Sequence, residues 1–482
     1  MRSTLSYSRR MGFDTAPILD TIADLVGLAP RATGTPGGAA AADYVRQRFD
    51  AAGLSTEVME VPSFAWHADR VHVQAGDTAV PCAPILHSGL PAHDWTGAAQ
   101  HRIDARVVDI GASRIGRRDV RGAVVLFDLT FDMTLAHTLP LTLSLHDPER
   151  RVLRRDVLSS RNPYVTSLAR TMTAAAEAGA VGVIGVLRDY PESLGYHNEY
   201  YRRTLFRLPG AWVTRRGGEL LRSALRDGAR VRLELDLRRE AATSRSVLGV
   251  LPGRSRETIM IQSHHDSVGA GAVEDASGTA EVIALAEHYG RSVAPRSREK
   301  TLLFTTFDTH FTGYHAHRAF AEQHVLSKNP RWDIVLNATI EHVGLRAVRG
   351  DDGGFRAVPE TEPRGVFVNV SLPLLRHIAR AVRRHGLHST SLLNAAPLEL
   401  LASGIPTDAS FTFVSGVPTV SLISGPLYLY DNADTIDRID ADQLVPVARF
   451  FADVVDEAER RRGPLLGVLP RPIRRLLPRG RW

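Results

Sequence analysis

A chain of 482 residues is too long for one compact core and indicates two or three domains. Its hydrophobic fraction of 44% and charged fraction of 23% are those of an ordinary globular protein. The single cysteine, Cys82, excludes an internal disulfide and a metal site built from several cysteines, and it fits a reducing compartment.

The formal net charge of +6 is concentrated at one end of the chain. The last 23 residues hold eight arginines and no acidic residue, so the rest of the chain has a formal charge of about −2. We therefore expect no nucleic-acid partner, since that would require a basic face with aromatic platforms. The basic tail, residues 463–482, could touch an anionic membrane surface; packing along the body or a lack of fixed structure are the alternatives. Arg9 and Arg10 are followed by no apolar stretch, which predicts a cytoplasmic protein.

The predicted elements fall into three stretches. Residues 15–52 have helical spacing, and residues 55–64 alternate like a strand. Between about 85 and 240, short strands are spaced by an alanine-rich helix at 165–178 and a second helix at 217–227. From about 244 onward strands and helices alternate, which predicts an α/β fold with a doubly wound, mostly parallel sheet.

These stretches predict a discontinuous domain, residues 1–85 and 243–462, interrupted by a smaller β-rich insert at 86–242 and followed by the basic tail. Residues 346–364 are polar and rich in glycine and proline, which indicates a loop. Whether this loop borders the functional site or is a plain surface loop stays open.

Side chains that bind metal ions gather at the ends of predicted strands. They are His264, His265 and Asp266 after one strand, Glu274 and Asp275 in a turn before a helix, Asp308 and His310 after a second strand, and Glu341 and His342 after a third. A catalytic metal site needs such ligands from adjacent strand ends, with one coordination position open. One histidine alone would more often be a core or surface residue, but the four places together indicate a metal site.

The motifs around these residues resemble the co-catalytic zinc aminopeptidases, a family that includes glutamate carboxypeptidase and glutaminyl cyclase. The similar segments are SHHDS, GAVEDASGTAEVIALAE, NATIEHVG, GIPTDASFTFVSGVPTVSL and DNADTID. AAAEAGAVGVIGV and LPGAWVTRRGGELLRSAL resemble a protease-associated domain, which is often inserted into these peptidases. The resemblance covers roughly residues 15–460 and implies one or two zinc ions.

The resemblance also implies roles for four residues. His264 would be a ligand of the first metal, and Asp266 would orient it. Glu274 would bridge two metals, and Glu341 would complete the first; the family has Asp at both of these positions.

Two segments depart from the family pattern. Where the family has paired glutamates, FDTHFTG offers Asp308, interpreted as the general base, and His310, interpreted as a replacement ligand. Where the family has its last histidine, this chain has Tyr430 followed by Asp431. Asp431 could bind the metal directly, and Tyr430 could donate a hydrogen bond to a tetrahedral oxyanion.

These observations predict a metal-dependent hydrolase of an amide bond in a small peptide or amino-acid conjugate. Two alternatives stay open because the second metal site is altered. One is an acyltransferase or cyclase of the same fold with one metal, and the other is a binding or scaffold protein that has lost catalysis. A homo-oligomer is also left open.

Overall fold

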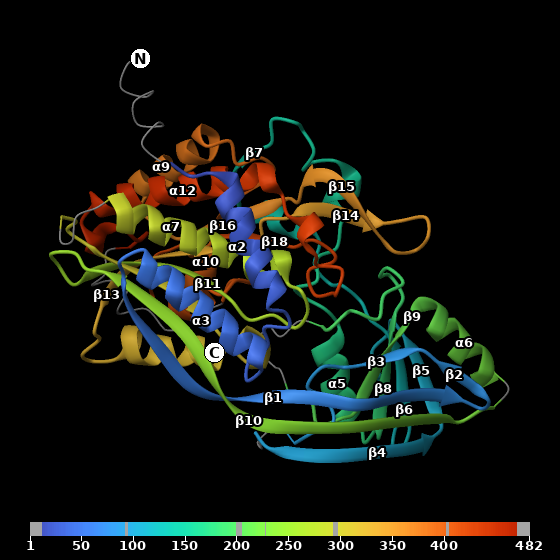
Figure 1. The fold of residues 1–482 in the computed structure, drawn as a ribbon. Coiled ribbons are helices and arrows are strands. Elements are labelled where there is room, and N and C mark those ends of the chain that lie inside the picture. Colours follow the sequence, from blue (N-terminus) through green and yellow to red (C-terminus); the bar gives the residue numbers. More distant parts are fainter. Residues whose placement is uncertain are drawn as a thin grey trace.

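The computed structural model describes residues 12–91, 95–198, 205–226, 228–292, 297–401 and 404–469. Most of the predicted basic tail therefore lies outside the described residues. Figure 1 shows a larger body of helices and strands, a smaller sheet beside it, and long strands that run beneath both. Within the described ranges, no helix combines the length and the apolar character needed to cross a bilayer.

One large sheet organises the molecule. In spatial order its strands are β2 (Thr78–Val80), β1 (Ser55–Ala75), β10 (Val231–Leu251), β12 (Thr301–Phe307), β11 (Glu257–His264), β13 (Asp333–Ile340), β18 (Thr419–Ser424), β16 (Arg364–Val368), β17 (Thr390–Asn394) and β7 (Thr142–His146), with β4 (Gly97–Ala105) pairing with β10. The neighbours β12, β11, β13 and β18 are parallel, and nearly every residue in them is buried. Parallel strands that are buried on both faces typically have continuous apolar sequences. The predicted α/β class with a mostly parallel central sheet is confirmed.

Helices cover both faces of these parallel strands. They are α2 (Thr15–Gly27), α3 (Pro36–Ala51), α7 (Gly278–Ser292), α8 (His315–Ala321), α9 (Leu372–Arg384), α10 (Ala396–Leu400), α11 (Ser410–Val414) and α12 (Ala441–Glu459). Side chains alternate between the two faces, as a strand requires. Ile259 and Ile261 join the core that includes α7 and α12, whereas Met260 packs with Phe320 of α8.

A separate five-stranded sheet forms most of the insert. Its order is β3 (Cys82–Pro84), β9 (Gly210–Thr214), β8 (Gly182–Leu187), β6 (Val124–Asp128) and β5 (Val107–Gly111), flanked by α5 (Leu168–Glu177) and α6 (Arg215–Arg226). The short helix α4 (Arg155–Leu158) instead lies near the residues around Arg346 and Glu360. A second core fills the space between this sheet and the outer ends of β1 and β10. Figure 1 shows these two strands passing from the main body to the insert.

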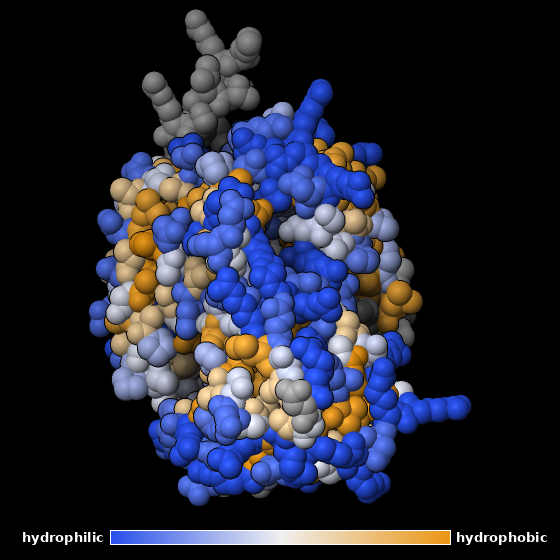
Figure 2. All heavy atoms as spheres, turned by 90° about the vertical axis from the view of Figure 1, so that its right-hand side faces the viewer, coloured by the Kyte–Doolittle hydropathy of each residue, from blue (hydrophilic) through white to orange (hydrophobic). Residues whose placement is uncertain are grey.

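The division into domains stays a prediction. Its boundary at residues 242 and 243 falls inside β10, and β7, which belongs to the insert in sequence, pairs with β17 of the main sheet. The predicted loop at 346–364 is instead largely a hairpin of β14 (Leu345–Arg349) and β15 (Phe355–Thr361), because the Asp-Asp-Gly-Gly stretch forms its turn. Figure 2 shows that polar side chains cover most of the face seen in that view, with apolar ones between them.

Candidate metal centre

Six acidic or imidazole side chains meet at the carboxyl ends of the parallel strands. They are His264 at the end of β11, Glu274 in the turn before α7, His310 after β12, Glu341 and His342 after β13, and Asp408 before α11. All are buried: His310 is 6% exposed and the other five are at most 2% exposed. Parallel strands place their ends at one edge of the sheet, which is why residues far apart in sequence meet there.

The carboxylate of Glu274 is the centre of this group. His264 Nε2 lies 3.4 Å and His310 Nε2 lies 3.3 Å from its Oε1, and His342 Nε2 contacts its Oε2. Both oxygens of Glu274 and the Nε2 atoms of His264 and His342 are buried without a hydrogen-bond partner among the described residues. Buried polar atoms that lack partners are costly, and a cation among them would satisfy all four.

The other nitrogen of each imidazole points at an oxygen. His264 Nδ1 lies 3.2 Å from Asp266 Oδ1, and His310 Nδ1 lies 2.9 Å from Asp408 Oδ1. His342 Nδ1 lies 2.8 Å from the carbonyl oxygen of Ser424. An Nδ1–H that donates to oxygen leaves the lone pair on Nε2, which is the usual arrangement of a metal-binding histidine.

The donors fit zinc by number and by type. Two groups of three have ligand atoms within 4.8 Å of one another: His264, His310 and Asp408 form one, and His264, Glu274 and His342 form the other. Imidazole nitrogen and carboxylate oxygen are ordinary zinc ligands, and three protein ligands leave a coordination position for water or substrate. The two groups share His264, and one imidazole nitrogen binds one ion, so with two ions one of them would be held without His264.

The electrostatic field favours positive charge here. Burial alone would lower the pKa of His342, but the adjacent carboxylate of Glu274 raises it to about 10. Burial likewise opposes the charge of His264, and its Asp266 partner and other carboxylates raise the pKa well above its usual value. Carboxylates that hold a proton this firmly also attract a divalent cation.

A buried arginine holds the loop between two of these residues. Arg31 is fully buried and donates to the carbonyl oxygens of His265, Ala270 and Gly271. Asp434 accepts from the backbone N–H groups of Val273 and Glu274. These bonds set the path of residues 265–274 between His264 and Glu274.

The structure brings some of the predicted site residues together and leaves others outside the donor groups. His264, Glu274 and His310 are together, with Asp266 behind His264. Glu341 accepts from the backbone N–H of Asp408 (2.7 Å), and its Oε2 is buried without a partner among the described residues, but Glu341 belongs to neither donor group.

Asp308 also lies outside both donor groups. Its oxygens accept from the Thr33 hydroxyl and from the backbone N–H groups of Arg245 and Thr309. Burial and the charge of Asp266 raise the pKa of Asp308 to about 7.

The segment around residue 430 binds the insert. Asp431 accepts from the hydroxyls of Ser193 (3.0 Å) and Tyr190 (3.3 Å) and stands outside both donor groups. The carbonyl oxygen of Tyr430 accepts from His197 N–H, and its ring packs edge-on against His197 and Phe311. The ligand role of Asp431 and the oxyanion role of Tyr430 therefore stay predictions.

Sequence reasoning missed several contributors. His342 was noted at its strand end without a role, and Asp408 lies in the Gly-Ile-Pro-Thr-Asp turn, where only its resemblance to the family was visible. Arg31 acts through backbone carbonyls more than 230 residues away, for which no local signal exists.

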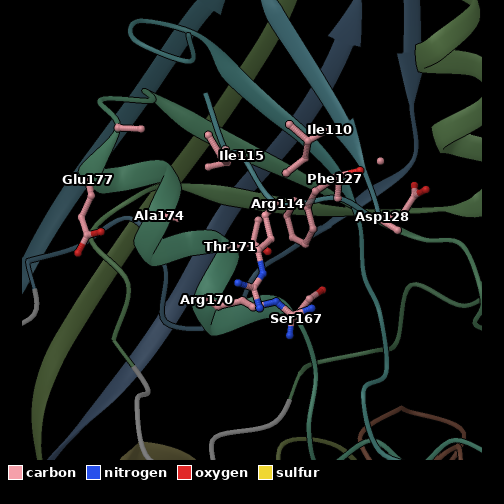
Figure 3. Close-up of a pocket in the computed structure, with 15 residues that line it drawn as sticks. Ile110, Arg114, Ile115, Phe127, Asp128, Ser167, Arg170, Thr171, Ala174 and Glu177 are labelled. Carbon is pink, nitrogen blue, oxygen red and sulfur yellow. The ribbon is translucent and has the colours of Figure 1, made fainter. Parts of the chain in front are cut away.

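A cavity in the insert is separate from this centre. It has a volume of about 670 Å³ and lies between α5 and the carboxyl ends of β5 and β6. Figure 3 shows Arg170, Thr171 and Ala174 of α5 along one side of it, with Ile110 and Phe127 among the residues of the strands. None of the residues that meet at Glu274 lines this cavity.

Comparisons with known proteins agree with this geometry. Residues 246–345 match the model of peptidase family M28. This range includes five of the six residues that meet at the strand ends, all except Asp408. No curated protein matches the chain.

Among solved structures, the chain is similar to a zinc aminopeptidase from Bacillus subtilis, with 16% identity, a TM-score of 0.63, and coverage of 95% of this chain and 98% of that one. A Peptidase M28 precursor from Shewanella amazonensis SB2B has 18% identity, a TM-score of 0.63, and coverage of 94% and 95%. An aminopeptidase from Aneurinibacillus sp. strain AM-1 has 18% identity, a TM-score of 0.60, and coverage of 92% and 94%. At these identities the likeness establishes the fold.

Proposed function

We propose that this metal-dependent peptidase, whose residues 246–345 match the model of peptidase family M28, cleaves an amide bond in a small peptide or amino-acid conjugate in the manner of an aminopeptidase. The observation that carries the proposal is the convergence of three imidazole Nε2 atoms on the buried carboxylate of Glu274. Zinc bound there would polarise the scissile carbonyl and lower the pKa of a water molecule.

The residues of the centre have three roles in this proposal: binding the metal, orienting its ligands and accepting a proton. His264, Glu274 and His310 would hold the metal, and Asp266 and Asp408 fix the two imidazole rings through their Nδ1 atoms. Asp308 would take the proton of the attacking water, for which it would have to give up one of the hydrogen bonds that it accepts from Thr33, Arg245 and Thr309.

Three further roles depend on rearrangement at the site. Glu341 and Asp431 would have to move toward Glu274 to become ligands, since neither belongs to a donor group. Tyr430 would have to aim its hydroxyl at the reacting carbonyl to donate to the oxyanion.

The enclosure of the site supports a small substrate. The strand-end residues are almost fully buried, and rings of Tyr164 and His197 from the insert lie beside Tyr430. A folded protein segment would be excluded by these walls, whereas a short peptide or an amino-acid conjugate is compact enough to enter after a local opening. The protease-associated character of the insert, the cytoplasmic setting and a homo-oligomer belong to the same proposal.

Zinc analysis combined with assays tests this function. Protein purified without a histidine tag is expected to contain one or two zinc ions and to release the N-terminal residue from dipeptides or aminoacyl nitroanilides. A chelator should stop the reaction, and added zinc should restore it. Zinc with acyl transfer or cyclisation but no hydrolysis would favour the same-fold acyltransferase or cyclase, and a protein that binds no zinc would favour a scaffold.

A further inference from the structure

We propose that His342 is a metal ligand and that Tyr164, supplied by the insert, is the positioning residue that fixes its orientation. The proposal rests on the proposed function, because it requires a metal beside Glu274. The family resemblance places the ligand at this strand end on Glu341, so His342 would be an additional nitrogen ligand.

Tyr164 reaches the metal centre from outside the main domain. It lies between α4 and α5 of the insert, and its hydroxyl contacts His342 Nδ1 at 2.9 Å and the carbonyl oxygen of Ser424. Its ring lies nearly parallel to that of His342, with an angle of 19° and a centroid distance of 6.2 Å. Gly425 makes room for this ring, since a Cβ there would lie 2.8 Å from Tyr164 Cε2.

The three polar groups admit one arrangement of protons. The Ser424 carbonyl oxygen only accepts, and it faces both the Tyr164 hydroxyl and His342 Nδ1. If the hydroxyl donated to Nδ1, the lone pair of Nδ1 would also face the carbonyl at 2.8 Å, which is repulsive. The hydroxyl therefore donates to Ser424, and Nδ1–H donates to the carbonyl and the phenol oxygen.

This arrangement prepares His342 for a metal. With its proton on Nδ1, a neutral imidazole carries its lone pair on Nε2, and that atom contacts Glu274 Oε2. Apart from this contact with each other, neither atom has a hydrogen-bond partner among the described residues, so one cation could bind both. The same design recurs at His264 with Asp266 and at His310 with Asp408. At His342 a carbonyl and a phenol replace the carboxylate.

Zinc affinity measured on the full chain tests the proposal. Tyr164→Phe removes the hydroxyl and keeps the ring beside Gly425, and it should weaken zinc binding roughly 10- to 100-fold, as removal of such supporting partners does. The cobalt-substituted variant should have an altered visible spectrum, because the geometry of one nitrogen ligand changes. Tyr289→Phe is the matched control: it removes a buried hydroxyl that bonds to Ala452 and Asp456, distant in sequence from the centre, and should leave both measurements unchanged.

A second variant keeps the test decisive if Tyr164→Phe folds poorly. His342→Ala should weaken zinc binding more than Tyr164→Phe does, and free imidazole should restore part of the affinity. Wild-type zinc affinity and cobalt spectra in both Tyr164→Phe and His342→Ala would overturn the proposal and leave the proposed function intact. A wild-type protein that binds no zinc would overturn both.

Discussion

The replacement of Arg31 by methionine tests whether the buried guanidinium supports the metal centre. Arg31 donates four hydrogen bonds, to the carbonyl oxygens of Leu25, His265, Ala270 and Gly271, at 2.8–3.0 Å. Leu25 and Gly271 keep a backbone donor in the variant. The carbonyls of His265 and Ala270 lose the donor that Arg31 gives them.

The size of the effect follows from two opposing contributions. Leaving the buried carbonyl of His265 and the half-buried carbonyl of Ala270 without a donor, and losing two further bonds, costs roughly 4–8 kcal/mol. Against this, burial lowers the pKa of Arg31 from 12.5 to about 10, so removal of the charge returns about 3 kcal/mol. We expect the free energy of unfolding to fall by about 1–5 kcal/mol, a sizeable part of the usual total.

Urea unfolding followed by tryptophan fluorescence and by circular dichroism measures this change. The control is Arg102→Met, which removes a half-exposed partner of Asp236 and should cost less than about 1 kcal/mol. Zinc affinity should fall in Arg31→Met alone, because the loop it supports joins His264 to Glu274. A stability equal to that of the control variant, with normal zinc affinity, would refute the argument.

Three further predictions concern the ligands, the proton acceptor and pH. His264→Ala and Glu274→Ala should each weaken zinc binding by more than about 100-fold, and stoichiometric zinc in either purified variant would contradict the assignment. Asp308→Asn should lower kcat/KM by roughly 10²- to 10⁴-fold at unchanged zinc content; a comparable loss in Glu341→Gln with normal Asp308→Asn activity would move the role to Glu341. Burial raises the pKa of Glu362 to about 8, so the folded state retains its proton; that contribution to stability is complete below pH 4.5 and is lost as pH rises through 8. Glu362→Gln should therefore unfold at a higher urea concentration than wild type at pH 8.5, with little difference at pH 4.5, and parallel pH profiles would rule out this titration.

Local sequence carried much of the information about the strands of the site. The apolar runs before His264, His310 and Glu341 predicted buried parallel strands, and the rule that such strands end at one edge predicted that their last residues would meet. The structure brings His264, Glu274 and His310 together at that edge. The helices predicted at 165–178 and 217–227 are α5 and α6.

The remaining features depend on contacts across long stretches of chain. Asp408 meets His310 from 98 residues away, and Tyr164 meets His342 from 178 residues away. These contacts depend on how distant parts of the chain pack together, and the periodicity of a local sequence does not predict such packing. The hairpin at 345–361 was predicted as a loop because its turn residues dominate its composition.

The pairing of β1 with β10 has a consequence for how the chain can be shortened. Their ladder joins Ser55 to Val250 at one end and Ala75 to Val231 at the other, so the path out to the insert and the path back are antiparallel neighbours along its whole length. Excising 86–242 would remove more than half of β10 and leave the far part of β1 with only the short strand β2 beside it. A cut between Ala75 and Val231 could instead be closed by a two-residue turn, because directly opposed residues in such a ladder are only about 5 Å apart. A minimal enzyme made in this way would keep the ladder, and its His342 would have to be oriented by Ser424 alone.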